Sequence, residues 1–255
     1  MAMKRTVVRR AWVKAGAHEI VSPDIRFPDA NQAAKDVDAI EDFVGLNPPL
    51  DVLEIASGIG RYAIEFAKRG YRVVAIDTAR QLLDQAERAA KDASVVVEFR
   101  LKSATELSDK GHFDFILAHW HVVGFMTDEQ RKRHFAAVYS ALKPGCSFLY
   151  VFQGPRAVPG KKGDTVAPGR NWTEKDGKFI LSERAVQDGI PEEYSIVIDT
   201  ETAEIAEYRE QKSALGYREV LDLLKAAGFA SVRGYKDFAK TPATPEEFSI
   251  FVCQK

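Results

Sequence analysis

The sequence has only two cysteines among its 255 residues, Cys146 and Cys253, and both stand in apolar, strand-like runs. Such positions favour buried thiols, and the paired ligand spacing of a zinc site or a disulfide framework is missing. An apolar run of about 18 residues, which a membrane-spanning helix needs, is missing as well. No signal-peptide pattern follows the basic first residues. We therefore expect a cytoplasmic protein in a reducing compartment.

Neither sign of charge is in excess, since 36 Lys and Arg residues balance 37 Asp and Glu residues. Binding to nucleic acid or to an anionic membrane depends on a basic patch. The basic clusters at residues 4–10 and 131–133 are interpreted as a solvated tail and a solvated helix face. The sequence thus predicts neither a nucleic-acid nor a membrane partner, and it leaves a monomer and a homodimer both open.

The composition that is present suits a globular domain, with 45% hydrophobic and 29% charged residues. That balance supplies enough apolar surface to fill a core. A length of 255 residues fits one α/β domain that carries an insertion. We expect a single domain over residues 1–255, with residues 1–47 as an N-terminal cap segment and residues 153–212 as a lid.

Strand-like apolar runs alternate with helix-like patterns along most of the chain. This alternation favours right-handed crossovers and a mostly parallel sheet that is covered on both faces. Residues 127–130 have the spacing of a capping box, which predicts a helix that ends before Lys143. The expected strands span residues 52–55, 71–76, 95–99, 113–118, 147–152, 230–236 and 248–253, and the other helices span residues 31–46, 60–69, 79–91 and 217–227.

Residues 153–172 interrupt the alternation because they are rich in Gly, Pro and Lys. Three strand-like segments follow, at residues 179–186, 193–199 and 205–211. Residues 1–30 are expected to be irregular, since prolines break any helix there. The predicted fold class is α/β: a doubly wound, Rossmann-like, mostly parallel seven-stranded sheet with an antiparallel β insertion between its fifth and sixth strands.

A glycine pair, Gly58 and Gly60, follows the first predicted strand. Glycine allows the backbone to turn tightly and to approach a ligand closely. The next helix directs its first amide groups towards a bound molecule, and open parallel sheets bind ligands beyond the carboxyl ends of their strands. Asp77 ends the second strand, where a carboxylate can accept both hydroxyls of a ribose. These residues predict a site for a cofactor that contains adenosine.

Two cofactors fit this loop. Residues 58–63, Gly-Ile-Gly-Arg-Tyr-Ala, match the dinucleotide fingerprint with Asp77 in the ribose-binding position, so an NAD(P)-dependent Rossmann oxidoreductase is one alternative. Glu54 favours S-adenosylmethionine (SAM), because an acid in that strand suits the ammonium group of the methionine moiety. The chain also lacks a second full mononucleotide-binding half after its fifth strand. SAM is therefore the expected cofactor.

Longer runs around these residues match known motifs. Residues 52–61 are Val-Leu-Glu-Ile-Ala-Ser-Gly-Ile-Gly-Arg, and residues 72–77 are Arg-Val-Val-Ala-Ile-Asp. With residues 113–117, 142–145 and 208–210, they resemble the class I SAM-dependent methyltransferases. The resemblance is to the small-molecule branch with an antiparallel insertion, which includes aminosugar N-methyltransferases, and it extends over about residues 50–255.

The resemblance implies transfer of a methyl group from SAM to a nitrogen or oxygen of a small-molecule acceptor, by in-line displacement. Two residues depart from the family pattern. Ala56 replaces the first motif glycine, which is tolerable if Ala56 keeps ordinary strand dihedrals. Ser103 replaces an aspartate that accepts from the adenine amino group, so we expect a weaker or water-mediated contact. The expected cofactor-binding residues are Glu54, Ala56, Ser57, Gly58, Gly60, Asp77, Thr78, Ser103, Ala104, Ala118 and His119.

Two histidines, His119 and His121, follow the fourth strand, where the methyl group is expected to point. A neutral imidazole can take up a proton at neutral pH, and a general base adds roughly 10²–10⁴-fold to a rate. His121 is the first candidate for the base and His119 the second, although His119 can instead contact the methionine end through its backbone. The expected acceptor-binding residues are Trp120, Tyr62, Trp172, Tyr208 and Arg209, and the remaining histidines, His18, His112 and His134, are expected at the surface.

Two alternatives to this catalytic interpretation stay open. Catalysis can rest on proximity alone, without a histidine base. A non-catalytic SAM-binding partner subunit is the alternative from another functional class. No metal-ligand constellation is visible in the sequence, so no metal is expected, which argues against a magnesium-dependent catechol-type enzyme.

Overall fold

The computed structural model describes residues 8–13, 30–119, 122–152, 169–175, 177–187, 190–201, 205–211, 215–244 and 249–255. The chain divides into two compact units. The larger unit comprises residues 26–123, 127–154 and 215–255, and the smaller unit comprises residues 1–25, 124–126 and 155–214. Each unit has its own sheet. The organisation as one domain with a cap and a lid stays a prediction.

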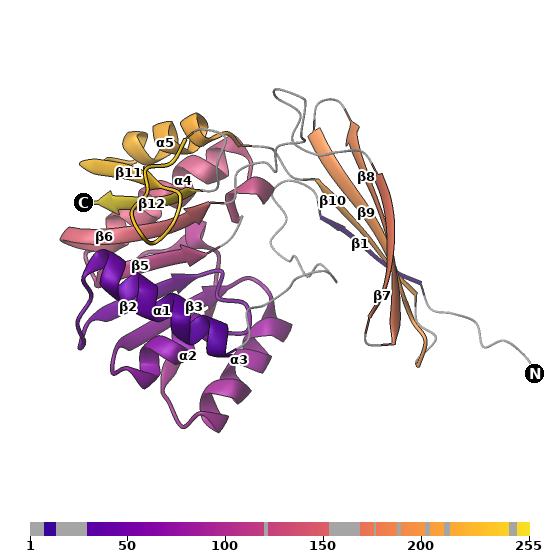
Figure 1. Ribbon diagram of the computed structural model, residues 1–255, viewed down its shortest axis with the longest axis horizontal. Helices are drawn as coiled ribbons and strands as arrows, with labels where there is room; N and C mark the ends of the chain where they lie inside the picture. The colour runs from indigo at the N-terminus through magenta and orange to yellow at the C-terminus, as the bar shows by residue number, and fades with distance from the viewer. Residues whose placement is uncertain are drawn as a thin grey trace, which may run out of the picture. The chain divides into compact units, whose positions relative to one another are not determined.

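The larger unit is built on a seven-stranded sheet with the order β11-β12-β6-β5-β2-β3-β4. Figure 1 shows this sheet with helices on both faces. The strands from β2 to β6 are parallel, whereas β12 is antiparallel to β6 and to β11. The predicted doubly wound, mostly parallel sheet is thus confirmed. The strands are β2 (Asp51–Ile55), β3 (Arg72–Asp77), β4 (Val97–Leu101), β5 (Phe113–His119), β6 (Leu142–Phe152), β11 (Ser231–Tyr235) and β12 (Ser249–Gln254).

The two faces of this sheet carry different helices, because successive side chains of a strand point to opposite faces. On one face, the Phe135 ring of α4 lies 5.7 Å from the Tyr150 ring, measured between centroids. On that face also, the Tyr217 ring of α5 lies 5.0 Å from the Phe251 ring. The opposite face carries α1 and α2. The helices are α1 (Ala30–Val44), α2 (Arg61–Lys68), α3 (Arg80–Asp92), α4 (Asp128–Ala141) and α5 (Tyr217–Ala226), with short 3-10 turns at η1 (Ala104–Glu106) and η2 (Val122–Phe125).

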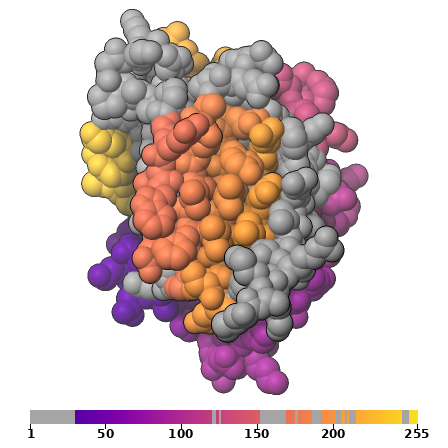
Figure 2. All heavy atoms as spheres, turned by 90° about the vertical axis from the view of Figure 1, so that its right-hand side faces the viewer, coloured from indigo at the N-terminus to yellow at the C-terminus, as the bar shows by residue number. Residues whose placement is uncertain are grey.

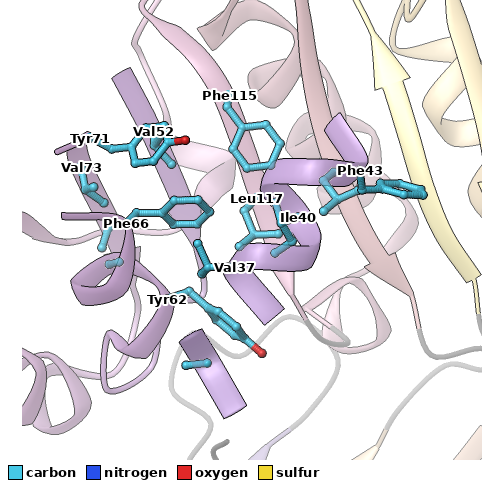
Figure 3. Packing of buried hydrophobic residues seen from close by; sticks show 14 of the residues in the cluster. Val37, Ile40, Phe43, Val52, Tyr62, Phe66, Tyr71, Val73, Phe115 and Leu117 are labelled. Atoms are coloured by element: carbon cyan, nitrogen blue, oxygen red, sulfur yellow. The ribbon is translucent and has the colours of Figure 1, made fainter. Parts of the chain in front are cut away.

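Apolar side chains of α1, α2 and the facing strands form one core (Figure 3). Val37 and Ile40 of α1 are fully buried in it, as are Phe66 of α2 and Phe115 of β5. Burial of one such side chain contributes about 1.5–3 kcal/mol to stability. This core holds α1 and α2 firmly against the sheet, and these two helices carry side chains of the candidate site.

The predicted capping box at the start of α4 is confirmed. The Thr127 hydroxyl accepts from the Gln130 N–H at 3.3 Å, and the Gln130 side chain accepts from the Thr127 N–H at 2.9 Å. These two bonds satisfy amide groups that a helix start otherwise leaves without partners. The helix ends at Ala141, before Lys143, as the sequence predicts.

The smaller unit contains a five-stranded sheet with the order β1-β10-β9-β8-β7. Strands β7 to β10 are antiparallel, which confirms the predicted antiparallel insertion. Figure 2 shows one face of these strands in orange. The strands are β1 (Val8–Val13), β7 (Gly169–Lys175), β8 (Lys178–Gln187), β9 (Ile190–Asp199) and β10 (Ile205–Gln211).

Two strands of the smaller unit correct the sequence-based expectation. Residues 169–175 form β7 although they continue the Gly-, Pro- and Lys-rich segment, and residues 8–13 form β1, parallel to β10, in a region expected to be irregular. β7 lacks an alternating apolar pattern. It is held by pairing with β8, where the Arg170 guanidinium lies 3.1 Å from the Glu183 carboxylate. Pairing with a neighbouring strand decides such segments more than their own composition.

Two basic side chains of α4 are buried, contrary to the expectation of solvated positions. His134 is 0% exposed and Arg131 is 5% exposed. Both lie on the same stripe of the helix as Phe135, at the spacing that faces the core. The Arg131 guanidinium donates to the Val123 carbonyl at 2.9 Å and to the Asp128 carboxylate at 2.6 Å. The charge of the buried Arg131 is therefore compensated by the carboxylate of Asp128, whose side chain is exposed.

The remaining expectations concern the two cysteines, two of the histidines and the absence of a membrane-spanning helix. Cys146 and Cys253 are free thiols, and Cys253 is fully buried whereas Cys146 is partly exposed. His112 is exposed, as expected, and His18 lies outside the described residues. Within the described ranges, no helix has the length and apolar character that crossing a membrane requires.

Candidate functional site

The carboxyl ends of β2, β3, β4 and β5 meet at one edge of the larger sheet, which we call the strand-end edge. Ile55 of β2 pairs with Ile76 of β3 and with Ala118 of β5, and Asp77 of β3 pairs with Leu101 of β4. Open parallel sheets bind their ligands at this kind of edge. The predicted cofactor residues gather there: Glu54, Ala56, Ser57, Gly58, Gly60, Asp77, Thr78, Ser103, Ala104, Ala118 and His119.

The loop between β2 and α2 depends on backbone conformations that glycine adopts readily. Gly58 and Gly60 have φ angles of 55° and 72°, in the left-handed region. A Cβ atom on Gly60 would lie 2.9 Å from Cε1 of Phe99 and 3.0 Å from Cβ of Ala86. Gly60 is therefore required by space as well as by conformation. Because α2 begins at the next residue, its first amide groups lie at the strand-end edge.

Ala56 has a φ angle of 54°, which contradicts the expectation of ordinary strand dihedrals. A left-handed alanine costs roughly 1–2 kcal/mol, because its Cβ crowds the following carbonyl oxygen. The next residue is held by a hydrogen bond from the Ser57 N–H to the Ile76 carbonyl at 3.0 Å. The loop thus keeps the backbone path of the glycine motif, with a strained alanine in it.

Asp77 ties the end of β3 to the glycine loop. Its Oδ2 accepts from the Gly58 N–H at 2.8 Å, and its Oδ1 accepts from the Ala79 N–H at 2.9 Å. Burial raises the pKa of this carboxyl, and the backbone N–H groups offset part of that effect because they favour the ionised form. Each carboxylate oxygen has a second lone pair. Asp77 can therefore also accept hydrogen bonds from a ligand.

Glu54 lies beneath the loop with 2% of its surface exposed. Its Oε2 accepts from the Ala63 N–H, in the first turn of α2, at 2.8 Å. Burial, together with the negative charge of Asp77, raises the pKa of Glu54 to about 8. A cation at the other carboxylate oxygen would favour the ionised form and bind well there.

The two serines of the strand-end edge use their hydroxyls differently. Among the described residues, the buried Ser57 Oγ has no hydrogen-bond partner, an unfavourable state that a polar ligand group would relieve. The Ser103 Oγ lies 2.9 Å from the Thr105 Oγ1 and accepts from the Thr105 N–H at 3.3 Å, and so caps η1. The Ser57 hydroxyl, which lacks a partner among the described residues, and the buried Glu54 acid fit a ligand with hydroxyl and cationic groups.

His119, the last residue of β5, contacts Tyr62 of α2. The Tyr62 Oη lies 3.4 Å from the His119 Nε2, and it donates to the Asp36 Oδ2 of α1 at 2.9 Å. Burial lowers the pKa of His119 to about 4, so this imidazole is neutral near pH 7. Burial and the Asp36 carboxylate raise the pKa of Tyr62 above its usual value. Sequence reasoning misses Asp36, because only the apolar side of its helix formed a recognisable pattern.

Two of the predicted site residues, Trp120 and His121, lie outside the described residues. Trp172, a predicted acceptor contact, belongs to the smaller unit. Its side chain is 64% exposed, and its ring stacks on Phe179 at 5.3 Å between centroids. Trp172 is therefore an accessible aromatic surface in β7.

The other two predicted acceptor contacts stand next to one another in β10. Arg209 has its Nε 3.4 Å from the Glu192 carboxylate, and its guanidinium lies 5.5 Å from the centre of the Tyr194 ring. Tyr208 pairs with Ser195 of β9, and its side chain lies outside the description. Arg209 therefore already has an acidic partner in its own sheet.

Comparisons with known sequences point to one family. The model of a family described as "Methyltransferase domain" matches residues 52–145, which contain the glycine loop and Asp77. A curated protein of Geobacillus sp. (strain WCH70), whose name gives it provisionally as a methyltransferase, is 28% identical over 100 residues, or 39% of this chain. The match spans 40% of the length of that relative.

Solved structures resemble the chain over most of its length. An S-adenosylmethionine-dependent methyltransferase from Clostridium acetobutylicum ATCC 824 has a TM-score of 0.75 at 16% identity, covering 91% of this chain and 92% of its own. A SAM-bound amino pentose methyltransferase from Micromonospora echinaspora has a TM-score of 0.60 at 20% identity, covering 88% and 90%. A sugar N-methyltransferase from Streptoalloteichus sp. ATCC 53650 has a TM-score of 0.64 at 14% identity, covering 94% and 99%. Residues 52–145 thus match the methyltransferase-domain model, and the chain has the fold of the class I SAM-dependent methyltransferases.

Proposed function

We propose that this protein transfers a methyl group from SAM to a nitrogen or oxygen of a small molecule. The observation that carries the proposal is the group of Glu54, Ser57 and Asp77 around the glycine loop. It offers a buried acid for an ammonium group, a hydroxyl in need of a partner and a carboxylate for a ribose. A dinucleotide has no comparable use for an acid at Glu54, which supports SAM over NAD(P).

The cofactor, when bound, supplies a methyl group on a positively charged sulfur, so the chain needs no covalent intermediate of its own. In the proposal, Glu54 binds the ammonium group and Asp77 binds the ribose hydroxyls. Ser103 meets the adenine with a hydroxyl that also caps η1, which suits a weak contact. The remaining proposed contacts are Ala56, Ser57, Gly58, Gly60, Thr78, Ala104, Ala118 and His119.

Proton removal from the acceptor is proposed to fall to a histidine. His121 is the first candidate, because the low pKa of His119, about 4, makes His119 a weak base. Orientation of the acceptor in line with the methyl carbon contributes roughly 7–11 kcal/mol in well-aligned systems. This contribution of orientation exceeds the roughly 10²–10⁴-fold that a general base typically adds, so methyl transfer by proximity alone stays an alternative.

The acceptor is proposed to be a small molecule that carries an amine or a hydroxyl. Two similar solved structures are named as an amino pentose methyltransferase and a sugar N-methyltransferase, which supports amino sugars as the first acceptors to test. Residues 153–212 are the proposed lid. Arg209 would have to exchange Glu192 for an acidic group of the acceptor. The proposed acceptor contacts are Trp120, Tyr62, Trp172, Tyr208 and Arg209.

Isothermal titration of the full chain with SAM and with NAD tests the cofactor. We expect SAM to bind and NAD not to bind, and NAD binding without SAM binding would refute the proposal. Asp77→Ala should weaken SAM binding roughly 10- to 100-fold, the range for a lost charge-assisted hydrogen bond. Asp84→Ala, on the exposed side of α3, is the matched control and should leave binding unchanged.

Turnover with a panel of amino sugars separates an enzyme from a SAM-binding partner subunit. Methyl transfer to any member supports the proposal, and SAM binding without transfer to any of them supports the partner subunit. His121→Ala and His119→Ala then locate the base, since its loss should lower kcat about 10²–10⁴-fold. If neither variant lowers kcat, catalysis rests on proximity.

A further inference from the structure

Asp36, Tyr62 and His119 form a continuous line of contacts from α1 through α2 to the end of β5. The Tyr62 Oη donates to the Asp36 Oδ2 at 2.9 Å and lies 3.4 Å from the His119 Nε2. The Tyr62 and His119 rings also pack together, with centroids 4.8 Å apart and planes inclined by 42°. All three residues belong to the larger unit, and its core holds the two helices that supply Asp36 and Tyr62.

The place of Tyr62 in the core explains how it can act on His119. Tyr62 is 5% exposed and lies at the margin of the apolar cluster. Its hydroxyl points away from the other labelled side chains (Figure 3). The ring is thus fixed by packing, and only its oxygen is available for polar contacts.

The hydrogen-bonding capacity of the three groups determines where the hydrogen of the imidazole lies. A phenol has one hydrogen, and in Tyr62 it is directed at Asp36. The other carboxylate oxygen of Asp36 accepts from the Gln32 amide at 2.8 Å, so Asp36 is an acceptor on both sides. The Tyr62 oxygen can therefore only accept at His119. A hydrogen bond along the 3.4 Å contact requires that the His119 Nε2 carries the hydrogen.

We propose that Asp36 and Tyr62 are positioning residues that hold His119 as the tautomer with its hydrogen on Nε2, which leaves the lone pair of this ring on Nδ1. The pKa directions agree with this arrangement. Burial lowers the pKa of His119 to about 4, so the ring is neutral near pH 7 and must adopt one of its two tautomers. Burial and Asp36 raise the pKa of Tyr62, so the phenol keeps its hydrogen.

This tautomer assigns distinct tasks to the two ring nitrogens. Nε2 fixes the ring against Tyr62, and Nδ1 is the atom through which His119 can accept a proton or a hydrogen bond. The role of Asp36 and Tyr62 in turnover rests on the proposed methyl transfer. The tautomer itself does not, because it depends only on contacts within the chain.

Nitrogen-15 NMR of the full chain labelled at histidine tests the tautomer without cofactor or acceptor. The sequence has five histidines, so the ring signals are few, and the signals lost in His119→Asn identify those of His119. At pH 7 we expect Nε2 of His119 to be protonated and Nδ1 to be unprotonated. A protonated Nδ1 in the unaltered protein would overturn the proposal.

Variants provide the sharper test, because a histidine in water also favours the hydrogen on Nε2. Asp36→Ala frees the Tyr62 hydrogen to donate to His119, so the fraction with the hydrogen on Nδ1 should rise from minor to major. Tyr62→Phe keeps the ring packing but removes the acceptor, and a mixture of tautomers is expected. Asp42→Ala, an exposed carboxylate on the same helix, is the matched control and should change nothing. Spectra unchanged in both Asp36→Ala and Tyr62→Phe would overturn the proposal.

Kinetics then test the positioning role. Asp36→Ala should lower kcat at least about tenfold, as the wrong tautomer does in other enzymes, while the KM for SAM stays within about twofold. A shifted tautomer with an unchanged kcat would overturn the role in turnover. If the unaltered protein transfers no methyl group while its tautomer behaves as expected, the proposed function fails and the structural inference stands.

Discussion

The two sheets of this protein hold their polar side chains in different ways. At the strand-end edge of the larger unit, carboxylates bond to the backbone: the buried Glu54 accepts from the Ala63 N–H, and the half-buried Asp77 accepts from the Gly58 N–H. In the smaller unit, polar side chains pair with one another across strands, as Arg170 does with Glu183. Backbone bonds fix the first set in place, whereas surface ion pairs are weak and can exchange partners.

The exposed fraction of aromatic residues also differs between the two units. Tyr62 at the strand-end edge is 5% exposed, whereas Trp172 of the smaller unit is 64% exposed. Under the proposed function, the buried, backbone-bonded site suits the cofactor, which never varies, and the exposed sheet surface suits contacts that differ between acceptors. Substitutions at the strand-end edge should therefore affect folding and cofactor binding, and those in the smaller unit should affect acceptor use.

The largest effect is expected from Gly60→Ala. An alanine at this position must keep the left-handed backbone conformation, and its Cβ would lie 2.9 Å from the Phe99 ring. The free energy of unfolding should therefore fall by roughly 2–5 kcal/mol. Chemical denaturation measures this loss in the free energy of unfolding. Gly45→Ala is the control, because Gly45 has a φ of 79° but no atom within 4 Å, and its cost should be only about 1–2 kcal/mol. Equal losses would show that space at Gly60 is unimportant.

The next effect concerns the pH dependence of SAM binding. Because the pKa of Glu54 is raised to about 8, its carboxyl carries a proton below that pH in the cofactor-free protein. Binding of an ammonium group requires the ionised form, so a proton must leave. The affinity should rise with pH, by up to about tenfold per unit between pH 5.5 and 7. Titration calorimetry in buffers of different ionisation enthalpy measures the proton released, and Glu54→Gln should abolish the dependence. A flat profile in the unaltered protein would contradict the role of Glu54.

A smaller gain is expected from Ala56→Gly. Relief of the left-handed strain, partly offset by the greater freedom of glycine in the unfolded chain, should stabilise the protein by about 1 kcal/mol. Ala79→Gly is the control at the same edge, since Ala79 has an ordinary φ of −97° and should lose stability. A loss of stability in Ala56→Gly would mean that the methyl group makes contacts that outweigh the strain.

The smallest effect on stability is expected from Trp172→Ala, about 0.5 kcal/mol, because most of this side chain is already in water. The KM for the acceptor should rise several-fold while the affinity for SAM stays unchanged. Thr173→Ala, the adjacent exposed position in β7, is the control. A change in SAM affinity would remove the distinction between the two units.

The sequence predicted the strand-end edge well because its determinants are local. Gly58, Gly60 and Asp77 stand next to strands with clear apolar runs, and the register of parallel strands brings their carboxyl ends together. The same logic failed for β7, since its stability comes from cross-strand pairing rather than from its own pattern. The prediction for His134 was wrong as well. A histidine was expected at the surface because of its residue type, but the position of His134 on the inner face of α4 places it in the core.

The sequence by itself determined the alternation of strands and helices, the antiparallel insertion and the residues that follow the strands. These depend on periodicity and on glycine, which act over a few residues. Only the tertiary structure decided that Ala56 is left-handed, that the Ser57 hydroxyl has no partner among the residues the structure describes, and that Asp36 reaches His119 through Tyr62. Those facts depend on which groups the fold brings within hydrogen-bond distance, and residues 26 or more positions apart carry no mark of that proximity in the sequence.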